Sequence, residues 1–240
     1  MNNPETIIVT GASSGIGRAI GLHLIEAGYR VIGLARDFSK FDCREPLLHA
    51  IAIDLSKLEE LPSRLEGIIR ETGEVSGVVC CAGTGRFGSL EEFSYVQIRE
   101  LIDLNLTSQV YVVRALLPGM KRRKSGTIVF MGSEAALAGG KRGAVYSATK
   151  FGLRGLAQSL RQECAASGVR TCIINPGMVK TEFFDTLGFG PGNKAANYIL
   201  PEDIARVVLD VIQARPGIVF DEINLSPQKK VIRFTQPTDR

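Results

Sequence analysis

Residues 6–17 read TIIVTGASSGIG, a β-branched run that stops at a glycine and leads into a helical pattern. Apolar residues then recur at helical spacing, at Ile16, Ala19, Ile20 and Leu24, until Gly28 ends the pattern. Glycines let the backbone turn sharply beside a ligand, and free N–H groups at a helix start favour a pyrophosphate. The stretch therefore predicts a dinucleotide site. Its expected contacts are Gly11, Ser13, Ser14, Gly15, Ile16 and Gly17.

The glycine spacing differs from the commonest dinucleotide fingerprint. It reads G-xxx-G-x-G here, whereas the common turn reads G-x-G-x-x-G. A plain tight turn between a strand and a helix is the alternative interpretation. The apolar strand before the turn and the helical pattern after it favour the binding site.

Strand and helix patterns alternate along the rest of the chain. Further strands are expected at 30–34, 49–53, 77–81, 127–131, 169–174 and 217–225. Helices are expected at 58–70, 96–117 with a stop at Pro118, 144–166 and 201–214. Because the strands are apolar throughout, we expect them to be buried on both faces. The pattern predicts an α/β protein, a doubly wound parallel sheet with helices on both faces.

Composition indicates an ordinary globular chain. The 240 residues are 45% hydrophobic and 22% charged, and we expect one domain over residues 1–240. The formal charge of +4 is scattered, and the one basic run, Lys121 to Lys124, is typical of a solvated helix end, so a nucleic-acid partner is not expected. No leader pattern or bilayer-length apolar run is visible, which predicts a cytoplasmic protein that does not bind membranes.

Cysteine and histidine positions argue against a metal site. The five cysteines show no CxxC spacing, which is typical of reduced, mostly buried thiols. His23 and His49 are isolated from each other and from the motifs below. No metal ligands are therefore assigned.

Tyr146 and Lys150 lie four residues apart on the expected helix 144–166. This spacing places both side chains on one helix face, where they can reach one reacting centre. A neighbouring ammonium favours the phenolate, so we expect Lys150 to lower the pKa of Tyr146 and to make an acid–base pair. An amphipathic surface position for Tyr146 is the alternative.

The end of the second strand bears on the choice of cofactor. An acidic residue there binds the adenosine ribose of NAD, whereas an arginine accommodates the 2′-phosphate of NADP. The chain has Arg36 followed by Asp37, and we prefer NADP over NAD, with Asp37 as the rival signal. Asp54 and Leu55, after the third strand, are expected to touch the adenine edge. A cap or turn role for Asp54 is equally open.

Taken together, the motifs resemble the short-chain dehydrogenase/reductase family of the ordinary single-domain type, over about residues 5–225. The likeness is carried by residues 10–17, Asn105 in DLNL, Ser133 in MGS, Tyr146 with Lys150, and NPG at 175–177 followed by Thr181. It implies a Rossmann fold with strand order 3-2-1-4-5-6-7. It also implies a homotetramer or homodimer in which helices 96–117 and 144–166 pair across a two-fold axis.

The resemblance also implies roles for the four polar residues. Tyr146 would exchange a proton with the substrate oxygen, and Lys150 would hold the nicotinamide ribose and lower the tyrosine pKa. Ser133 would orient the carbonyl, and Asn105 would hold a water that links Lys150 to solvent. The alternatives are a helix-cap role for Ser133 and a helix-kink role for Asn105. A polar side chain such as Asn105 inside an apolar helix needs hydrogen-bond partners, which favours a functional role over a chance position.

One family motif is altered after the fourth strand. The expected Asn-Asn-Ala-Gly reads Cys80-Cys81-Ala82-Gly83, so the asparagine contacts are lost while Ala82 and Gly83 still leave room for the cofactor. The rigidity of the fourth strand, or the affinity for the cofactor, is therefore expected to be lower. By the same resemblance, Pro176 and Gly177 border the cofactor, and Thr181 meets its carboxamide.

The substrate region is less defined. Residues 182–200 are rich in phenylalanine and glycine and predict an apolar lid, with an irregular surface loop as the alternative. Residues 227–240 form a basic tail whose Val231, Ile232 and Phe234 could pack on the core or on a second subunit. Arg86, Lys141 and Arg142 border the cleft and raise the hypothesis of an acidic substrate.

These expectations favour an NADP-dependent oxidoreductase that interconverts a secondary alcohol and a ketone of small size. A catalytically silent protein that senses NADP is the alternative from another class. Retention of Asn105, Ser133, Tyr146 and Lys150 counts against it. A nucleotide-sugar epimerase or dehydratase of the extended branch is disfavoured by the short chain and by the glycine spacing.

Overall fold

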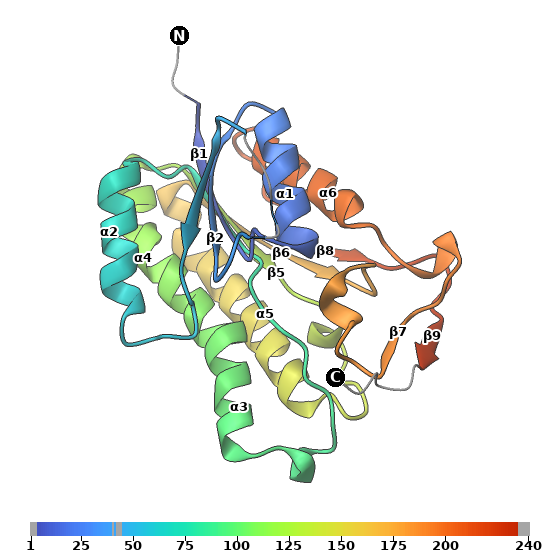
Figure 1. The fold of residues 1–240 in the computed structure, drawn as a ribbon. Helices are drawn as coiled ribbons and strands as arrows, with labels where there is room; N and C mark the ends of the chain where they lie inside the picture. Colours follow the sequence, from blue (N-terminus) through green and yellow to red (C-terminus); the bar gives the residue numbers. More distant parts are fainter. Residues whose placement is uncertain (1–3, 40, 42–44, 235–240) are drawn as a thin grey trace.

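A seven-stranded parallel sheet forms the centre of the computed structural model, which describes residues 4–39, 41 and 45–234 (Figure 1). Its order is β3-β2-β1-β4-β5-β6-β8, which confirms the predicted fold class and strand order. The seventh strand is labelled β8 because a short strand, β7, precedes it in the chain. The strands are β1 Thr6–Thr10, β2 Arg30–Ala35, β3 Leu48–Ala52, β4 Gly77–Cys80, β5 Gly126–Met131, β6 Val169–Pro176 and β8 Glu222–Leu225.

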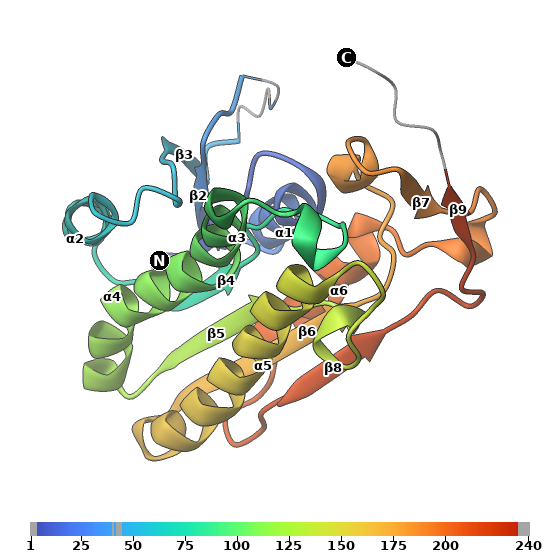
Figure 2. The same cartoon turned by 90° about the horizontal axis from the view of Figure 1, so that it is seen from below.

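Helices cover both faces of the sheet (Figure 2). One layer contains α1 Gly15–Glu26 and α6 Pro201–Gln213. The other contains α2 Leu61–Thr72, α4 Ser108–Arg123 and α5 Ala144–Cys164. Side chains alternate along a strand, so Ile7 and Val9 pack toward the first layer and Ile8 toward the second. Both faces of the central strands are therefore buried, as the apolar runs predicted.

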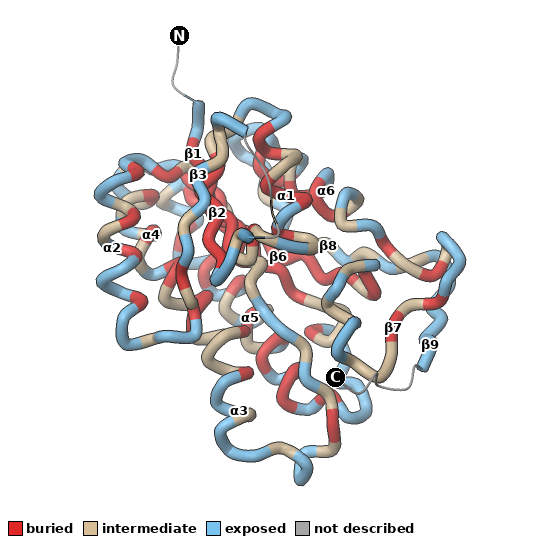
Figure 3. Tube along the Cα trace, in the orientation of Figure 1, coloured by how far each residue is buried: buried red, intermediate tan, exposed pale blue. Residues whose placement is uncertain are grey.

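The sheet edge at β3 differs from that prediction. His49, Ala50 and Ala52 are exposed, and Leu48 and Ile51 are only partly buried (Figure 3). Because β3 pairs with β2 alone, one of its sides has no neighbouring strand. The prediction that all strands are buried on both faces is wrong for this strand.

The long helix expected at 96–117 is interrupted. It consists of α3 Tyr95–Ile102, a π-helical turn at Asp103–Thr107 and α4, which continues past Pro118 to Arg123. Leu116 and Met120, on either side of the proline, are buried, and this packing outweighs the lost backbone hydrogen bond. The π-helical turn changes the helical phase at Asn105, whose side chain is fully buried.

The segment after β6 folds back on itself. It contains short 3₁₀ turns at Glu182–Phe184 and Ala195–Asn197, and β7 Phe189–Pro191. β7 pairs antiparallel with β9 Ile232–Phe234 in the tail, beside the main sheet (Figure 1). The last strand of the main sheet begins at Glu222 and not at 217. Residues 235–240 of the predicted tail lie outside the described residues.

Most of the apolar side chains of the helices expected to pair between subunits are buried within the single chain. Leu101 on α3, Val112 on α4 and Leu153 on α5 are each at most 2% exposed. Phe151 on α5 is exposed, at 43%. The excess of apolar residues is therefore used mainly by the chain's own core, and the predicted oligomer stays a prediction.

Candidate active site

The glycine turn between β1 and α1 has the geometry of a phosphate cradle. Gly11 and Gly15 have positive φ angles of 68° and 49°, a region that favours glycine. A side chain at Gly17 would clash with the Gly11 carbonyl oxygen. The Ser14 side chain makes no capping hydrogen bond at the start of α1. The turn is thus held close to the helix start, where backbone N–H groups attract anions.

Two side chains support the altered motif after β4. The Thr10 hydroxyl accepts hydrogen bonds from the backbone N–H groups of Cys81 and Ala82, both at 2.9 Å. It donates to Gln109 Oε1 at 3.4 Å, and Gln109 Nε2 donates to the Ala82 carbonyl oxygen at 3.2 Å. The loss of rigidity expected from Cys80-Cys81 is therefore compensated. Gln109 was not among the predicted site residues, although it lies one helical turn after Asn105.

Asn105 holds the backbone of the same loop. Its Oδ1 atom accepts a hydrogen bond from Thr84 N–H at 2.9 Å, and its Nδ2 atom donates to the Thr84 carbonyl oxygen at 2.8 Å. A Cβ atom at Gly83 would lie 3.1 Å from Asn105 Oδ1 and 3.9 Å from Lys150 Nζ. Asn105, Gly83 and Lys150 are therefore close neighbours in the fold.

Tyr146 and Ser133 meet at the carboxyl end of β5. Tyr146 is only 8% exposed. Burial raises the pKa of Tyr146 to about 12, while the hydrogen-bonding influence of the nearby Ser133 side chain lowers it and the Glu134 charge raises it. Ser133 also caps a 3₁₀ turn by accepting the N–H of Ala135 at 3.1 Å. The cap role and the contact with the tyrosine coexist.

Lys150 lies beside the tyrosine ring. Its ammonium donates to the Met131 carbonyl oxygen at 2.9 Å and stands 5.6 Å from the centroid of the Tyr146 ring. Burial lowers the pKa of Lys150 to about 8, against a smaller rise from Cys81. We had expected Lys150 to lower the tyrosine pKa. In this structure the pKa of Tyr146 is raised instead, because removal from water outweighs the other influences.

The expected adenosine end is a hollow beyond β2 and β3. A cavity of ≈ 190 Å³ is lined by Arg36, Ala52, Ile53, Asp54, Lys57, Glu60, Leu61 and Arg64. The carboxylate of Asp37, the rival NAD signal, accepts two hydrogen bonds from Ser39, both at 2.7 Å. Leu55 is buried in the core, so its side chain does not line this cavity.

Asp54 shows the turn role that had been left open. Its carboxylate accepts hydrogen bonds from the N–H and the hydroxyl of Ser56 at 2.9 and 2.7 Å. Burial raises the pKa of Asp54, but the Ser56 bonds and the positive charges of Arg36 and Lys57 lower it overall. The carboxylate is therefore held charged within the reach of Arg36.

Thr181 lies beside the glycine turn, and Gly177 lies beside the turn after β5 and the tail. A Cβ atom at Gly15 would lie 3.3 Å from the Thr181 methyl group. A Cβ at Gly177 would lie 3.5 Å from Glu134 and 3.0 Å from Pro227. Pro176 is the last residue of β6 and directly precedes Gly177. The fold thus brings the predicted cofactor contacts of β1, β4, β5 and β6 to one edge of the sheet.

Other sequence expectations concern the cysteines, metal ions and membranes. Cys80, Cys164 and Cys172 are buried free thiols and Cys81 is half-buried, while Cys43 lies outside the described residues. Within residues 4–39, 41 and 45–234, no group of three or more His, Cys, Asp or Glu side chains could hold a metal ion. In the same part of the chain, none of the helices has the length and hydropathy to cross a bilayer.

Comparisons with known proteins agree with this architecture. Residues 5–189 match the family model described as short chain dehydrogenase. An uncharacterized short-chain type dehydrogenase/reductase of Sinorhizobium fredii is 32% identical over 98% of this chain and 96% of its own. An uncharacterized oxidoreductase of Staphylococcus haemolyticus is 30% identical over 94% and 98%.

Two solved structures extend the likeness to three dimensions. A metagenomic short-chain oxidoreductase in complex with NADP is 30% identical, with a TM-score of 0.80 over 94% of this chain and 98% of that one. An alcohol dehydrogenase of the archaeon Thermococcus sibiricus, complexed with 5-hydroxy-NADP, is 26% identical with a TM-score of 0.84 over 95% and 98%. The chain belongs to the short-chain dehydrogenase family of oxidoreductases.

Proposed function

We propose that this oxidoreductase uses NADP to interconvert a secondary alcohol and a ketone, with Tyr146 as the general acid and base. The observation that carries the proposal is that Tyr146, Ser133 and Lys150 come together at the sheet edge where the glycine turn lies. Two neighbouring hydroxyls can both hydrogen-bond one carbonyl oxygen. Lys150, one helical turn away, completes the set.

The residues present fit a dinucleotide. Gly11, Gly15 and Gly17 form a cradle that side chains would fill, and Gly83 keeps the region beside Lys150 open. At the other end, the exposed Arg36 and its cavity suit the 2′-phosphate of NADP, whereas the Asp37 carboxylate is engaged by Ser39. The NADP complexes of the two similar solved structures support the same cofactor. Ile16, Asp54, Leu55, Ala82, Pro176 and Thr181 would complete its contacts.

The chain's own residues handle the proton and the orientation of the substrate. When bound, NADP supplies or accepts the hydride. Tyr146 would give its hydroxyl proton to the oxygen formed from a ketone, or accept the alcohol proton in the reverse direction. Ser133 would hold that oxygen with a second hydrogen bond. Lys150 would bind the nicotinamide ribose, and its ammonium would favour the phenolate.

The remaining assignments are part of the same proposal. Asn105 would hold the loop at Thr84 and a water that connects Lys150 with solvent. Residues 182–200 would act as a lid, residues 227–240 as a tail beside it, and 1–240 as one domain. The active form would be a homodimer or homotetramer.

A carbonyl panel tests this function against the silent NADP sensor. The purified protein would be mixed with NADPH and a set of uncharged ketones, and the loss of NADPH absorbance would be followed. Saturable NADPH oxidation with at least one ketone is expected. Tight NADPH binding with no oxidation across the panel would favour the sensor and overturn the enzyme.

A further inference from the structure

Tyr146 belongs to an aromatic cluster formed by Phe87, Tyr146, Phe183, Phe184 and Phe189. The rings are linked in a closed circuit, each contacting two others. The centroid distances are 5.1 Å for Phe87–Tyr146, 5.0 Å for Phe87–Phe189, 5.9 Å for Phe184–Phe189, 5.2 Å for Phe183–Phe184 and 6.2 Å for Tyr146–Phe183. These distances are within the range of favourable ring contacts.

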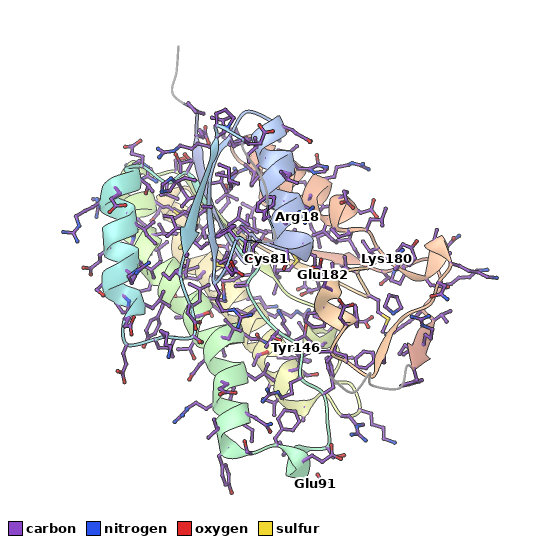
Figure 4. All side chains as sticks on the ribbon, viewed as in Figure 1. Arg18, Cys81, Glu91, Tyr146, Lys180 and Glu182 are labelled. Atoms are coloured by element: carbon purple, nitrogen blue, oxygen red, sulfur yellow. The ribbon has the colours of Figure 1, made fainter. Side chains whose placement is uncertain are left out.

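The surroundings of this cluster are apolar on the side of α3. Tyr146 is labelled in Figure 4. Leu101 and Val145 are buried against it, and partly buried side chains pack around them. Those side chains are Phe87, Phe93, Ile98, Ile102, Ala135 and Phe183. This cluster is separate from the two large cores on the faces of the sheet. A group that reaches the Tyr146 hydroxyl from this side must therefore leave water.

The aromatic cluster has a fixed part and a part on the predicted lid. Phe87 follows β4 and Tyr146 lies on α5, whereas Phe183, Phe184 and Phe189 lie in the segment after β6. Because Tyr146 is almost fully buried beneath these rings, a substrate can reach its hydroxyl only if lid rings move aside. That movement removes the ring contacts of Phe87 with Phe189 and of Tyr146 with Phe183.

Two arginines that could have bound an acidic substrate are already paired. Arg142 lies 3.0 Å from the Glu92 carboxylate, and Arg86 lies 3.8 Å from Glu100. Both pairs are half-exposed, and neither arginine belongs to the apolar cluster around Tyr146. A charged group placed against Phe87 and Tyr146 would lose its water without gaining a partner from either arginine. The surroundings favour an uncharged substrate.

The shape of the space favours a flat group. A Cβ atom at Gly85 would clash with the Phe183 ring and lie 2.9 Å from Phe87, so the backbone there is packed directly against ring faces or edges. Phe87 meets Phe189 edge to face, with an interplanar angle of 84°. A planar π-system in the place of Phe189 can make the same edge-to-face contact with Phe87. A bulky aliphatic group does not fit that place as well.

Resting on the proposed function, we propose that the substrate is a ketone, or the matching alcohol, with a flat uncharged aromatic group beside the reacting carbon. This group binds against Phe87 and Tyr146 in the space that the Phe183 and Phe189 rings fill in this structure, and the carbonyl oxygen points to the Tyr146 and Ser133 hydroxyls. Phe87, which stays in place, is then a specificity-determining residue. The reaction itself stays the one proposed above.

Steady-state kinetics with three carbonyl probes test this selectivity. We expect kcat/KM to be higher for acetophenone than for 2-butanone, and lowest for acetoacetate. In Phe87→Leu, kcat/KM for acetophenone should fall roughly 3- to 10-fold, the value of one aromatic contact, while 2-butanone changes less than about 2-fold. Phe220→Leu, an exposed ring outside the cluster, is the matched control. Preference for acetoacetate, or equal losses for both neutral ketones, would overturn the proposal and leave the oxidoreductase function intact.

A binding measurement tests the aromatic site independently of the proposed redox reaction. The chain contains no tryptophan, so Phe189→Trp introduces a single reporter into the cluster. Acetophenone added in the presence of NADP, which cannot reduce a ketone, should change the tryptophan emission saturably, and acetoacetate should not. A response to acetophenone without turnover of any carbonyl would support the aromatic site and contradict the proposed reaction. No response to acetophenone would overturn the aromatic site.

Discussion

The Lys150 ammonium lies 5.6 Å from the centroid of the Tyr146 ring, and both side chains are more than nine-tenths buried. Burial favours the neutral form of both side chains. It lowers the pKa of Lys150 to about 8 and raises the pKa of Tyr146 to about 12. The pair is therefore held with little water around it. Charge brought by substrate or cofactor acts strongly in such surroundings.

The lowered pKa of Lys150 makes stability depend on pH. Between pH 8 and 10 an unfolded lysine keeps its proton, whereas folded Lys150 has largely lost it. The unfolded state thus binds more protons, and the free energy of unfolding should rise with pH in this window. Relative to Lys150→Met, the wild-type value should rise by on the order of 2 kcal/mol, as measured by urea unfolding. Parallel curves for the two proteins would contradict this.

Glu134 should set the pH range of alcohol oxidation. Oxidation needs the Tyr146 phenolate, and the Glu134 charge adds to the burial that raises the Tyr146 pKa. Glu134→Gln removes that charge and frees Lys230, its partner at 2.8 Å, and both changes favour the phenolate. The rising limb of kcat against pH should move to lower pH. Asp221→Asn, which breaks the ion pair with Arg161, is the control; an equal shift there would refute the local effect.

Much of the architecture follows from local sequence signals. Apolar strands that end in turns predicted the sheet, and the glycines at 11, 15 and 17 predicted the phosphate cradle. The pairing of 189–191 with 232–234 was missed because it joins short segments far apart in the chain. The helix pattern across 96–117 concealed the π-helical turn at Asn105, since apolar periodicity does not report one inserted residue.

The pKa shifts at the site were harder to predict than the residues that form it. Spacing places Tyr146 and Lys150 on one helix face, but the direction of the tyrosine shift depends on how fully the fold removes it from water. Likewise, Thr10 and Gln109 compensate for Cys80-Cys81 through contacts between distant segments. Such contacts exist only once the sheet has formed.

Arg36 should decide between the two nicotinamide cofactors. Arg36→Ser removes one of the three exposed cations that line the cavity beyond β2, the one at the end of that strand, so NADPH affinity should fall roughly 10- to 100-fold, the worth of a charge-assisted contact to phosphate. NADH affinity should stay within about 2-fold. Both are measured by cofactor fluorescence titration, with Arg70→Ser on the far end of α2 as the control. Equal losses for both cofactors would argue against a 2′-phosphate contact.

Two glycines should respond oppositely to alanine. A Cβ at Gly17 would clash with the Gly11 carbonyl oxygen, so Gly17→Ala should destabilise the fold by roughly 1–3 kcal/mol and abolish cofactor binding. At Gly67, inside α2, nothing lies within 4 Å of the added atom. Gly67→Ala should stabilise by about 0.5–1 kcal/mol because alanine is the better helix former. Urea unfolding measures both; a Gly17→Ala protein that is as stable as wild type and binds NADPH would contradict the cradle.

The most direct test of the proposed chemistry removes one oxygen atom. Tyr146→Phe keeps the ring contact with Phe87, while it deletes the hydroxyl beside Ser133. We expect kcat for ketone reduction at saturating NADPH to fall roughly 10²- to 10⁴-fold, the usual value of a general acid, with NADPH affinity unchanged. Turnover by Tyr146→Phe within a few-fold of wild type would contradict the role of Tyr146 as the proton donor.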